Sequence, residues 1–314
     1  MAKALRTGDT IGLIAPASPA RSEERIQKSV QYFERLGYRV ELGKHLMDGP
    51  GYLAAPDKNR LADLHAMFRN KHVRAIFFIR GGYGSIRLLD NIDYDLIRRY
   101  PKIVVGYSDA TALFNAIYKK TGLASCFFGP MPGVDLWDTV DPFTEENFWR
   151  AVTSTKPLGE LPLGEAEGIV LYKGKALEIQ GRMLGGNLTV FNSLLGTPYQ
   201  PSIRNAIPFF EEIDEKPRKI DAHFAQLQLA GLFQNSKAIL LGQFTGCNED
   251  TDSPTLSLSE IFDDYFGALH MPVISNLPFG HESRMWTLPL GAKMRVLVAN
   301  DHASISLVEA SLII

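Results

Sequence analysis

The stretch Lys102-Ile-Val-Val-Gly-Tyr-Ser-Asp109 decides how this chain is interpreted, because a β-branched apolar run ends there in a tight turn. Residues 110–117 follow with the pattern of a helix. A serine at the tip of a strand-to-helix turn has its hydroxyl pushed out of the fold, beside free backbone N–H groups that can hold an oxyanion. Ser108 is therefore a candidate nucleophile. The full nucleophile elbow reads G-x-S-x-G, whereas the fifth position here is Ala110. The alternative is a serine near a helix N-cap, which is a common arrangement.

The first half of the chain alternates strand-like and helical segments around this turn. Apolar runs predict strands at residues 10–15, 38–42 and 73–79. Apolar residues at helical spacing predict a helix after Ser22, a second helix over residues 57–68 and a short one around Leu96. Strands that alternate with helices predict a parallel, doubly wound sheet.

The second half begins after a weakly patterned region. Residues 129–175 contain many Pro, Gly, Asp and Glu residues, so we interpret them as a connection or boundary. Beyond it, we expect strands at residues 207–213, 238–244, 272–276 and 294–298. Expected helices cover residues 187–195, opened by two glycines, and a segment that starts at Pro217 and includes Leu232. We place one α/β domain at residues 1–168 and a second at 169–314.

Composition restricts the class of protein. The chain has 314 residues, which suggests about two domains, and its 45% hydrophobic and 22% charged content is typical of a globular protein. The formal net charge of −2, with Lys and Arg spread along the chain, predicts no nucleic-acid partner. We see no apolar leader or membrane-spanning run, and two cysteines, Cys126 and Cys247, are too few for a disulfide framework. We expect a cytoplasmic protein with no membrane partner.

Three further segments carry residues suited to chemistry. Arg80-Gly-Gly-Tyr-Gly84 follows a predicted strand, so its N–H groups could cradle an anion, with a simple tight turn as the alternative. Glu211 and Glu212 end a predicted strand on opposite faces, so one of them could orient a histidine, or both could be solvated. His281 follows a Pro-containing turn and could be a general base to Ser108, although six other histidines compete for that role.

Other chemistries lack a sequence pattern. No H-E-x-x-H, C-x-x-C or Asp-rich loop predicts a metal. The glycine segment is neither a dinucleotide fingerprint nor a Walker loop. The apolar flanks of Cys126 favour a buried cysteine over a thiol nucleophile. We therefore expect no metal and no cofactor.

Together, these segments resemble the LD-carboxypeptidases, a serine peptidase family that includes muramoyl-tetrapeptide carboxypeptidases and microcin C immunity peptidases. The resemblance covers most of the chain. It depends on the order and spacing of six motifs: Gly8-Asp-Thr-Ile-Gly-Leu-Ile-Ala-Pro-Ala-Ser18, Ile79-Arg-Gly-Gly-Tyr-Gly84, Val105-Gly-Tyr-Ser-Asp109, Leu184-Gly-Gly-Asn-Leu188, Phe210-Glu-Glu212 and Leu277-Pro-Phe-Gly-His281. It implies an N-terminal flavodoxin-like parallel-sheet domain, a C-terminal β/α domain, a site between them and a homodimer.

The resemblance also implies a catalytic triad. Ser108 matches the family nucleophile, His281 the general base, and Glu211 the acid that orients the imidazole. An Asp usually follows that acid in the family, whereas Glu212 stands there in this chain. The choice between the two neighbouring acids therefore stays open.

Further roles follow from the same motifs. The oxyanion hole would combine the N–H of Asp109 with one from Gly81 or Gly82. We expect substrate contacts from three more motif residues, namely Arg80, Tyr107 and Asn187.

The activity implied by the resemblance is hydrolysis of an L-D peptide bond. It would release C-terminal D-alanine from a murein tetrapeptide during cell-wall recycling. One alternative is a hydrolase of microcin-type toxins, and another is a non-catalytic α/β ligand-binding protein. A nucleotide-binding oxidoreductase is disfavoured because the glycine fingerprint is missing.

Overall fold

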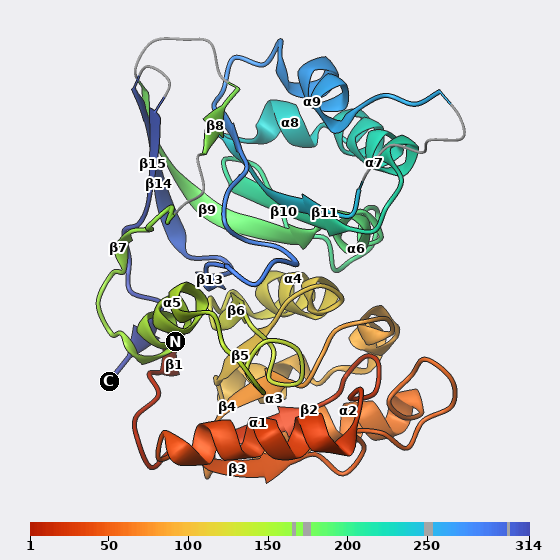
Figure 1. Ribbon diagram of the computed structural model, residues 1–314, viewed down its shortest axis with the longest axis vertical. Coiled ribbons are helices and arrows are strands. Elements are labelled where there is room, and N and C mark those ends of the chain that lie inside the picture. The colour runs from red at the N-terminus through yellow and green to blue at the C-terminus, as the bar shows by residue number, and fades with distance from the viewer. Residues whose placement is uncertain (165–167, 172–176, 248–253, 300–301) are drawn as a thin grey trace.

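The computed structural model describes residues 1–164, 168–171, 177–247, 254–299 and 302–314, which form two stacked α/β domains (Figure 1). The N-terminal domain is built on a six-stranded sheet of order β13-β6-β5-β4-β2-β3. Its parallel strands are β3 (Arg39–Leu42), β2 (Thr10–Ile14), β4 (Val73–Phe78), β5 (Ile103–Gly106) and β6 (Cys126–Phe128). Counted along the chain, these five strands have the spatial order 2-1-3-4-5 of the flavodoxin-like fold, which confirms the expected fold class.

Local sequence explains the elements of this domain. Strand β5 is buried at every position, which is why it reads as a continuous apolar run. Helix α1 (Glu23–Arg35) begins where the Ser22 hydroxyl accepts a bond from the N–H of Arg25. Helix α4 (Ala110–Thr121) ends at Gly122, which has a left-handed φ of 71°. Three further helices of this domain are α2 (Asp57–Arg69), the 3-10 helix η1 (Ser85–Asn91), which follows the glycine segment, and α3 (Tyr94–Arg99).

Helix α5 (Pro142–Thr153) lies inside residues 129–175, so the interpretation of that whole region as a connection is wrong. The Asp141 carboxylate caps the helix by accepting bonds from the N–H groups of Phe143 (2.9 Å) and Thr144 (3.2 Å). Pro142 occupies the first turn, and the Phe148 ring packs against Phe77 of the sheet. The Asp-Pro pair is the sequence signal for this helix, because it combines a good N-cap with a proline at N1.

The C-terminal domain has an eight-stranded sheet of order β7-β15-β14-β9-β10-β11-β12-β8. Its parallel strands are β9 (Leu177–Asn187), β10 (Ile207–Ile213), β11 (Ile239–Thr245) and β12 (Val273–Ser275). Antiparallel pairs add β8 (Ile169–Val170), β14 (Lys293–Ala299), β15 (His302–Leu307) and β7 (Gly159–Glu160). The helices are α6 (Leu188–Asn192), α7 (Pro217–Leu229), α8 (Leu232–Asn235) and α9 (Leu258–Phe266).

Two expected helices of this domain differ from the structure. The helix expected at residues 187–195 is shorter, because Asn187 is the N-cap of α6 and the glycines before it still belong to β9. The helix that starts at Pro217 does not reach Leu232. Gly231, with a left-handed φ of 73°, separates α7 from α8.

The two sheets exchange short strands across the expected boundary at residue 168. Strand β7 precedes that boundary but pairs with β15, whereas β13 (Leu288–Pro289) follows it but pairs with β6. Strand β1 (Ala2–Lys3) pairs with β16 (Leu312–Ile313), so the chain ends lie side by side (Figure 1). These pairings tie the two domains into one arrangement.

Glycines at the end of β9 let helix α4 pack closely against the C-terminal sheet. A Cβ on Gly186 would lie 2.3 Å from Thr111 Oγ1. The Thr111 hydroxyl oxygen accepts a bond from the N–H of Asn187 (2.9 Å), and Asn115 Nδ2 donates to Gly185 O (2.8 Å). Because α4 begins directly after the Ser108 turn, this contact places that turn against the strands that carry the acidic pair.

Candidate active site

Ser108 occupies a strained turn at the carboxyl end of β5. Its φ is +61°, and the other non-glycine residues with positive φ in the described part of the chain are Asn205, Asp214 and Asn276. Asn and Asp tolerate this conformation, whereas for other side chains it costs about 1–2 kcal/mol. Gly106 relieves crowding in this turn, since a Cβ there would lie 3.2 Å from the Ala110 methyl group. Strain of this kind is typical of functional positions.

The glycine segment after β4 lies directly against this serine. A Cβ on Gly81 would lie 2.9 Å from Ser108 Cβ and 3.2 Å from its Oγ. The Asp109 carboxylate holds the segment by accepting bonds from the N–H groups of Gly84 (3.2 Å) and Ser85 (2.9 Å). Among the hydrogen bonds of the described residues, none uses the N–H of Asp109 or Gly82. Unused N–H groups beside a serine hydroxyl are suited to an oxyanion hole.

Replacing Gly81 with Ala is expected to lower kcat/KM by up to about 100-fold, because the new methyl group, 2.9 Å from Ser108 Cβ, must displace the serine. Gly168→Ala is the matched control, since a Cβ there meets its nearest neighbour at an ordinary 3.4 Å. Steady-state kinetics on both variants, with thermal unfolding as a check of the fold, test this expectation. An unchanged kcat/KM for Gly81→Ala would contradict the close packing described above.

Glu211 and His281 form a buried pair in the C-terminal domain. Glu211 Oε2 lies 2.7 Å from His281 Nδ1, and the carboxylate is fully buried at the side-chain level. Gly280 has a φ of +136°, and a Cβ on it would lie 3.3 Å from Glu211 Cβ. A glycine at this position therefore brings the histidine close to the strand. A carboxylate on Nδ1 leaves Nε2 of the neutral imidazole free to accept a proton.

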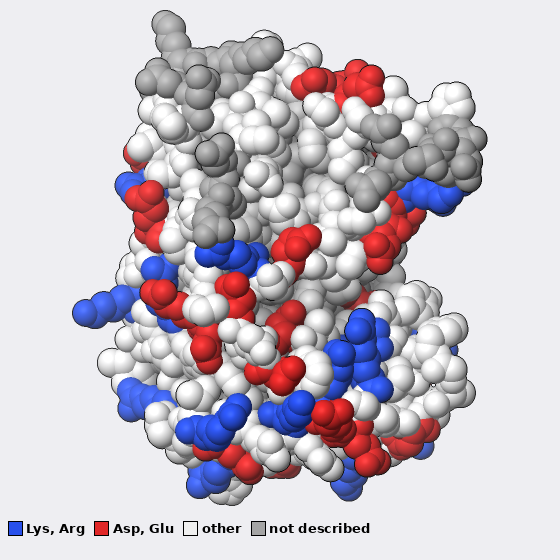
Figure 2. Space-filling view, viewed as in Figure 1, with Lys and Arg blue, Asp and Glu red and all other residues white. Residues whose placement is uncertain are grey.

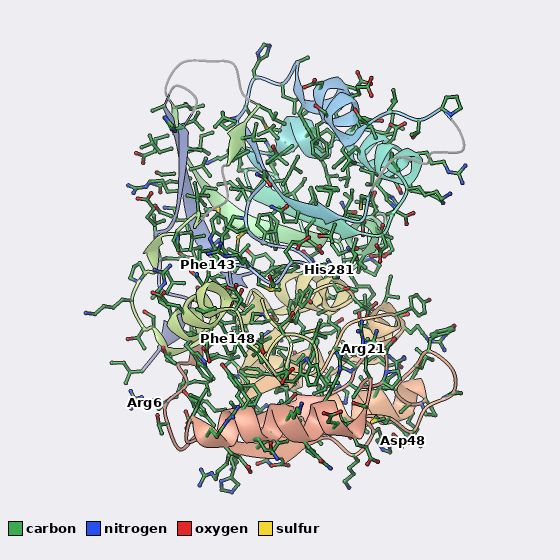
Figure 3. All side chains as sticks on the ribbon, viewed as in Figure 1. Arg6, Arg21, Asp48, Phe143, Phe148 and His281 are labelled. Carbon is green, nitrogen blue, oxygen red and sulfur yellow. The ribbon has the colours of Figure 1, made fainter. Side chains whose placement is uncertain are left out.

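His281 faces the N-terminal domain, at the boundary between the two domains (Figure 3). Its ring packs edge-on against the ring of Tyr107, with 4.9 Å between the ring centroids. Tyr107 directly precedes Ser108, so the docking of the domains brings the nucleophile candidate next to the base candidate. Within the described residues, the Ser108 hydroxyl makes no hydrogen bond. Catalytic hydrogen bonds often tighten only when substrate is bound.

Glu212 points to the opposite side of β10 and has a separate set of partners. Its carboxylate accepts bonds from Asn187 Nδ2 (2.7 Å), Thr189 N (2.9 Å) and Thr189 Oγ1 (2.6 Å). The Asn187 side-chain oxygen also caps α6 by accepting a bond from the N–H of Val190 (3.1 Å). Both polar groups of the Asn187 side chain are therefore engaged inside the protein. The structure therefore shows Asn187 supporting Glu212, and the expected contact with substrate stays a prediction.

Asp135 is a member of this site that sequence reasoning missed. It lies in the loop after β6, where its carboxylate accepts bonds from Met131 N (2.8 Å) and the Tyr107 hydroxyl (3.4 Å). Burial raises the pKa of Asp135 to about 6, although these bonds and the charge of His281 act in the opposite direction. Asp135 lies within the weakly patterned residues 129–175, but loops after parallel strands share one edge of the sheet, and this rule is the signal that points to it.

The charges around His281 raise its pKa. Burial is the largest single influence and lowers it, but the charge and hydrogen bond of Glu211 and the charges of Glu212 and Asp135 together outweigh burial. If the neutral imidazole is the base, kcat/KM should rise with pH, with a midpoint above the ordinary histidine value of about 6.5. We therefore expect the acid side of the pH–rate profile to lie at higher pH than it would for an ordinary histidine.

Asp135→Asn is expected to move that midpoint to lower pH, because it removes a negative charge that stabilises the imidazolium. Asp138→Asn is the matched control: it removes the same charge nearby, from an exposed carboxylate paired with Lys28 at 3.6 Å. Profiles of kcat/KM against pH for the wild type and both variants give the comparison. A midpoint that rises or stays fixed in Asp135→Asn would contradict this account of the electrostatics.

Other candidate chemistries find little support within the described residues. No group of three or more His, Cys, Asp or Glu side chains there is placed to hold a metal ion. Cys126 is fully buried, and burial raises the pKa of its thiol. No helix in these ranges combines the length and the apolar character needed to span a bilayer. On the face shown in Figure 2, charges of both signs are interspersed and no single-sign field covers the surface.

A serine on a strained turn, unused amides beside it and a carboxylate–imidazole pair opposite are typical of serine-type hydrolases. Comparison with known proteins gives the family. Residues 11–129 match the LD-carboxypeptidase N-terminal domain, and residues 180–296 match the LD-carboxypeptidase C-terminal domain. The chain belongs to the LD-carboxypeptidase family, which confirms the resemblance, and it is a serine-type hydrolase of that family.

Individual relatives match this chain in sequence or in structure over nearly its whole length. A probable murein peptide carboxypeptidase of Bacillus subtilis (strain 168) is 38% identical, over 96% of this chain and 93% of its own length. The microcin C7 self-immunity protein MccF, solved with aspartyl sulfamoyl adenosine, superposes with a TM-score of 0.90 at 28% identity, covering 100% of this chain and 99% of that one. The muramoyltetrapeptide carboxypeptidase of Oxalobacter formigenes gives 0.84 at 26% identity, over 96% and 99% of the two chains.

Proposed function

We propose that Ser108 is the nucleophile, His281 the general base and Glu211 the acid that orients it. The observation that carries this proposal is the 2.7 Å contact between Glu211 and His281, on an imidazole that packs against the residue next to Ser108. Serine is a weak nucleophile unless a base takes its proton, and the base needs a third group to fix its tautomer. Each of the three residues is positioned by a different element, namely the β5–α4 turn, the loop after β12 and strand β10.

In the proposed acylation step, Ser108 Oγ attacks the carbonyl carbon of the scissile peptide bond while its proton moves to His281 Nε2. The carbonyl oxygen becomes an oxyanion held by the N–H of Asp109 and one from Gly81 or Gly82. Each such donor contributes about 3–4 kcal/mol of transition-state stabilisation in other enzymes. The carbon–nitrogen bond then breaks, the leaving amine takes the proton from His281, and the acyl group stays on Ser108.

Deacylation repeats these steps with water. His281 removes a proton from the attacking water molecule, the oxyanion forms again in the same hole, and the serine ester bond breaks. The proton on His281 returns to Ser108 Oγ, so the enzyme ends in its initial state. Glu211 remains ionised throughout and stabilises the imidazolium that forms in each half-reaction.

The proposed substrate is a murein tetrapeptide, whose terminal L-D bond would be cleaved to release D-alanine for cell-wall recycling. The relatives named for murein peptides support this choice. A cavity of about 380 Å³ lies against Glu282, the residue that follows His281. Its walls come from both halves of the chain and include Phe143, Pro278 and Glu282.

A second candidate function is hydrolysis of a microcin-type aminoacyl nucleotide. The observation that favours it is the close superposition on the microcin C7 self-immunity protein. In that case the acyl enzyme would form in the same way, and the leaving group would be a sulfamoyl or phosphoramidate nucleotide. The triad alone does not discriminate between the two leaving groups.

Mass spectrometry separates these functions. Purified protein is incubated with murein tetrapeptide and, separately, with an aminoacyl sulfamoyl adenosine, and the products are identified. We expect loss of D-alanine from the tetrapeptide. Cleavage of only the adenosine compound would select the second function. A fluorophosphonate probe completes the test, because a non-catalytic binding protein would leave Ser108 unlabelled.

We also propose a cytoplasmic homodimer. Both cysteines, Cys126 and Cys247, are free and buried, which fits a reducing compartment. The dimer is an expectation from the family resemblance. Light scattering across a concentration series would measure the mass in solution, and fractionation of cells that produce the protein would locate it.

A further inference from the structure

Three arginines gather beside the candidate oxyanion hole. Arg80 directly precedes Gly81, and its Nη1 donates to Pro19 O (3.4 Å) in the loop that follows β2. Arg21 belongs to the same loop, and Arg25 lies in the first turns of α1. Burial lowers the pKa of the Arg80 guanidinium, and the nearby positive charges of Arg21 and Arg25 lower it further.

This cluster lies where a sheet of this kind binds ligands. Strand order reverses between β2 and β4, and Arg21 and Arg80 occupy the loops at the carboxyl ends of those two strands. Open α/β sheets place their ligands in the crevice at such a switch point. The two loops also pack tightly on each other, because the Ser18 hydroxyl accepts a bond from Tyr83 N (3.2 Å) and Ser18 N donates to Gly81 O (3.2 Å).

The cluster has an excess of positive charge. No ion pair joins Arg21, Arg25 or Arg80 to a carboxylate in the described ranges of the chain. Arg25 is held in place by a bond to Gly133 O (3.1 Å) and by the Trp137 ring, 4.2 Å below its guanidinium. Arg21 is exposed, and Arg80 is half-buried. Arginines that crowd together without a counter-charge are unfavourable unless an anion joins them.

The cluster is also close to the chemistry. Arg80 directly precedes Gly81, where a Cβ would lie 2.9 Å from Ser108 Cβ, and the ring of Tyr107 on the other side of Ser108 contacts His281. In Figure 3, Arg21 lies below and to the right of His281, whereas Phe143, which lines the cavity, lies to the left. Basic side chains of the N-terminal domain are visible beside the domain boundary in Figure 2.

We propose that Arg80 and Arg21 form the subsite for the C-terminal carboxylate of the peptide substrate, an assignment that rests on the carboxypeptidase function proposed above. In the residue that leaves, this carboxylate is only a few bonds from the carbonyl carbon that Ser108 attacks. A guanidinium that starts one residue before the oxyanion loop is at a suitable distance to hold it. Arginine matches a carboxylate with two parallel N–H···O bonds.

This assignment explains why the enzyme would act as a carboxypeptidase. A chain that continues past the scissile bond carries an amide in place of the carboxylate, and it would leave the guanidinium groups without their anion. Discrimination then comes from the loss of a charge-assisted bond as well as from any steric block. Arg25 adds its positive charge to the field at this subsite.

The test compares two forms of one peptide, a murein tetrapeptide with a free C-terminal carboxylate and the same peptide with a C-terminal amide. Wild-type protein should prefer the acid in kcat/KM. Arg80→Met and Arg21→Met should each reduce the acid-to-amide ratio, by about 10- to 100-fold for Arg80. Arg35→Met is the matched control, since it removes the same charge from an exposed residue at the other end of α1 and should keep the ratio.

Arg80→Lys keeps the charge but loses the planar fork, so it should reduce the ratio by less than Arg80→Met. Arg80→Lys also tests the role of Arg80 in the carboxylate subsite if Arg80→Met fails to fold. An acid preference that survives in Arg80→Met, or in Arg80→Lys when only that variant folds, would overturn the subsite and leave the proposed function intact. A wild-type protein that cleaves neither peptide would overturn the proposed function, and the subsite with it.

Discussion

Replacing Ser108 with Ala is expected to reduce kcat by about 10⁶-fold while peptide binding is retained. The substitution removes the only atom that can form the acyl enzyme in the proposed mechanism. It keeps the Cβ, so the strained turn and the contact with Gly81 should persist. Slow residual hydrolysis above the rate in water is expected, because the oxyanion donors remain. Single-turnover kinetics and calorimetric titration with the uncleaved peptide measure the two effects separately.

Ser193→Ala is a suitable control for the loss of a serine hydroxyl. Ser193 is exposed, and its hydroxyl donates only to Val190 O (2.6 Å), within the last turn of a short helix. This variant should keep wild-type kcat. If Ser108→Ala turned over substrate at a near-normal rate, another group would be the nucleophile and the role of the elbow would need a different explanation.

The second large effect is expected at Glu211. Glu211→Gln should lower kcat by about 10⁴-fold, as loss of the triad acid does in other serine hydrolases. The amide has nearly the same size, but it cannot stabilise the imidazolium by its charge. Its NH₂ group can also turn toward Nδ1 and favour the tautomer that leaves Nε2 protonated. The site gives this carboxylate little alternative support, since Oε1 is buried and has no partner within the described residues.

Glu212→Gln is the matched control, because it makes the same chemical change on the next residue of the same strand. Glu212 is also buried, but its bonds go to Asn187, Thr189 and the N–H of Ile213. An amide group in that place would oppose a donor and cost about 1–3 kcal/mol of stability. We therefore expect a lower urea midpoint and a smaller change in kcat. The reverse result, with Glu212→Gln inactive and Glu211→Gln nearly normal, would make Glu212 the orienting acid.

Local sequence was sufficient to predict the fold of the first domain and the turn that carries its candidate nucleophile. The alternation of strands and helices predicts the parallel sheet, and the apolar run into Gly106-Tyr-Ser-Asp109 predicts a serine on a turn. These features depend on short-range rules, because a turn and a helix cap involve residues only a few positions apart. The Asp141-Pro142 pair is a short-range signal of the same kind for α5. The many polar residues around this pair make the helix hard to distinguish from a loop.

Other features depended on tertiary structure. The alternation of side chains along β10 separates Glu211 from Glu212 but does not say which one faces the histidine. That follows only from the loop that brings Gly280 and His281 back onto the strand. Likewise, β7 and β13 each pair with the sheet of the opposite domain, a result that no sequence period reveals.

The composition of the site as a whole was decided by the same long-range packing. The sequence by itself determined which residue types could carry acyl transfer and which turn would present the serine. The tertiary structure placed Asp135 beside Tyr107 and brought Arg21 and Arg80 together from loops far apart in the chain. The physical reason is that parallel strands deliver their following loops to one edge, so distant residues meet there without any local signal.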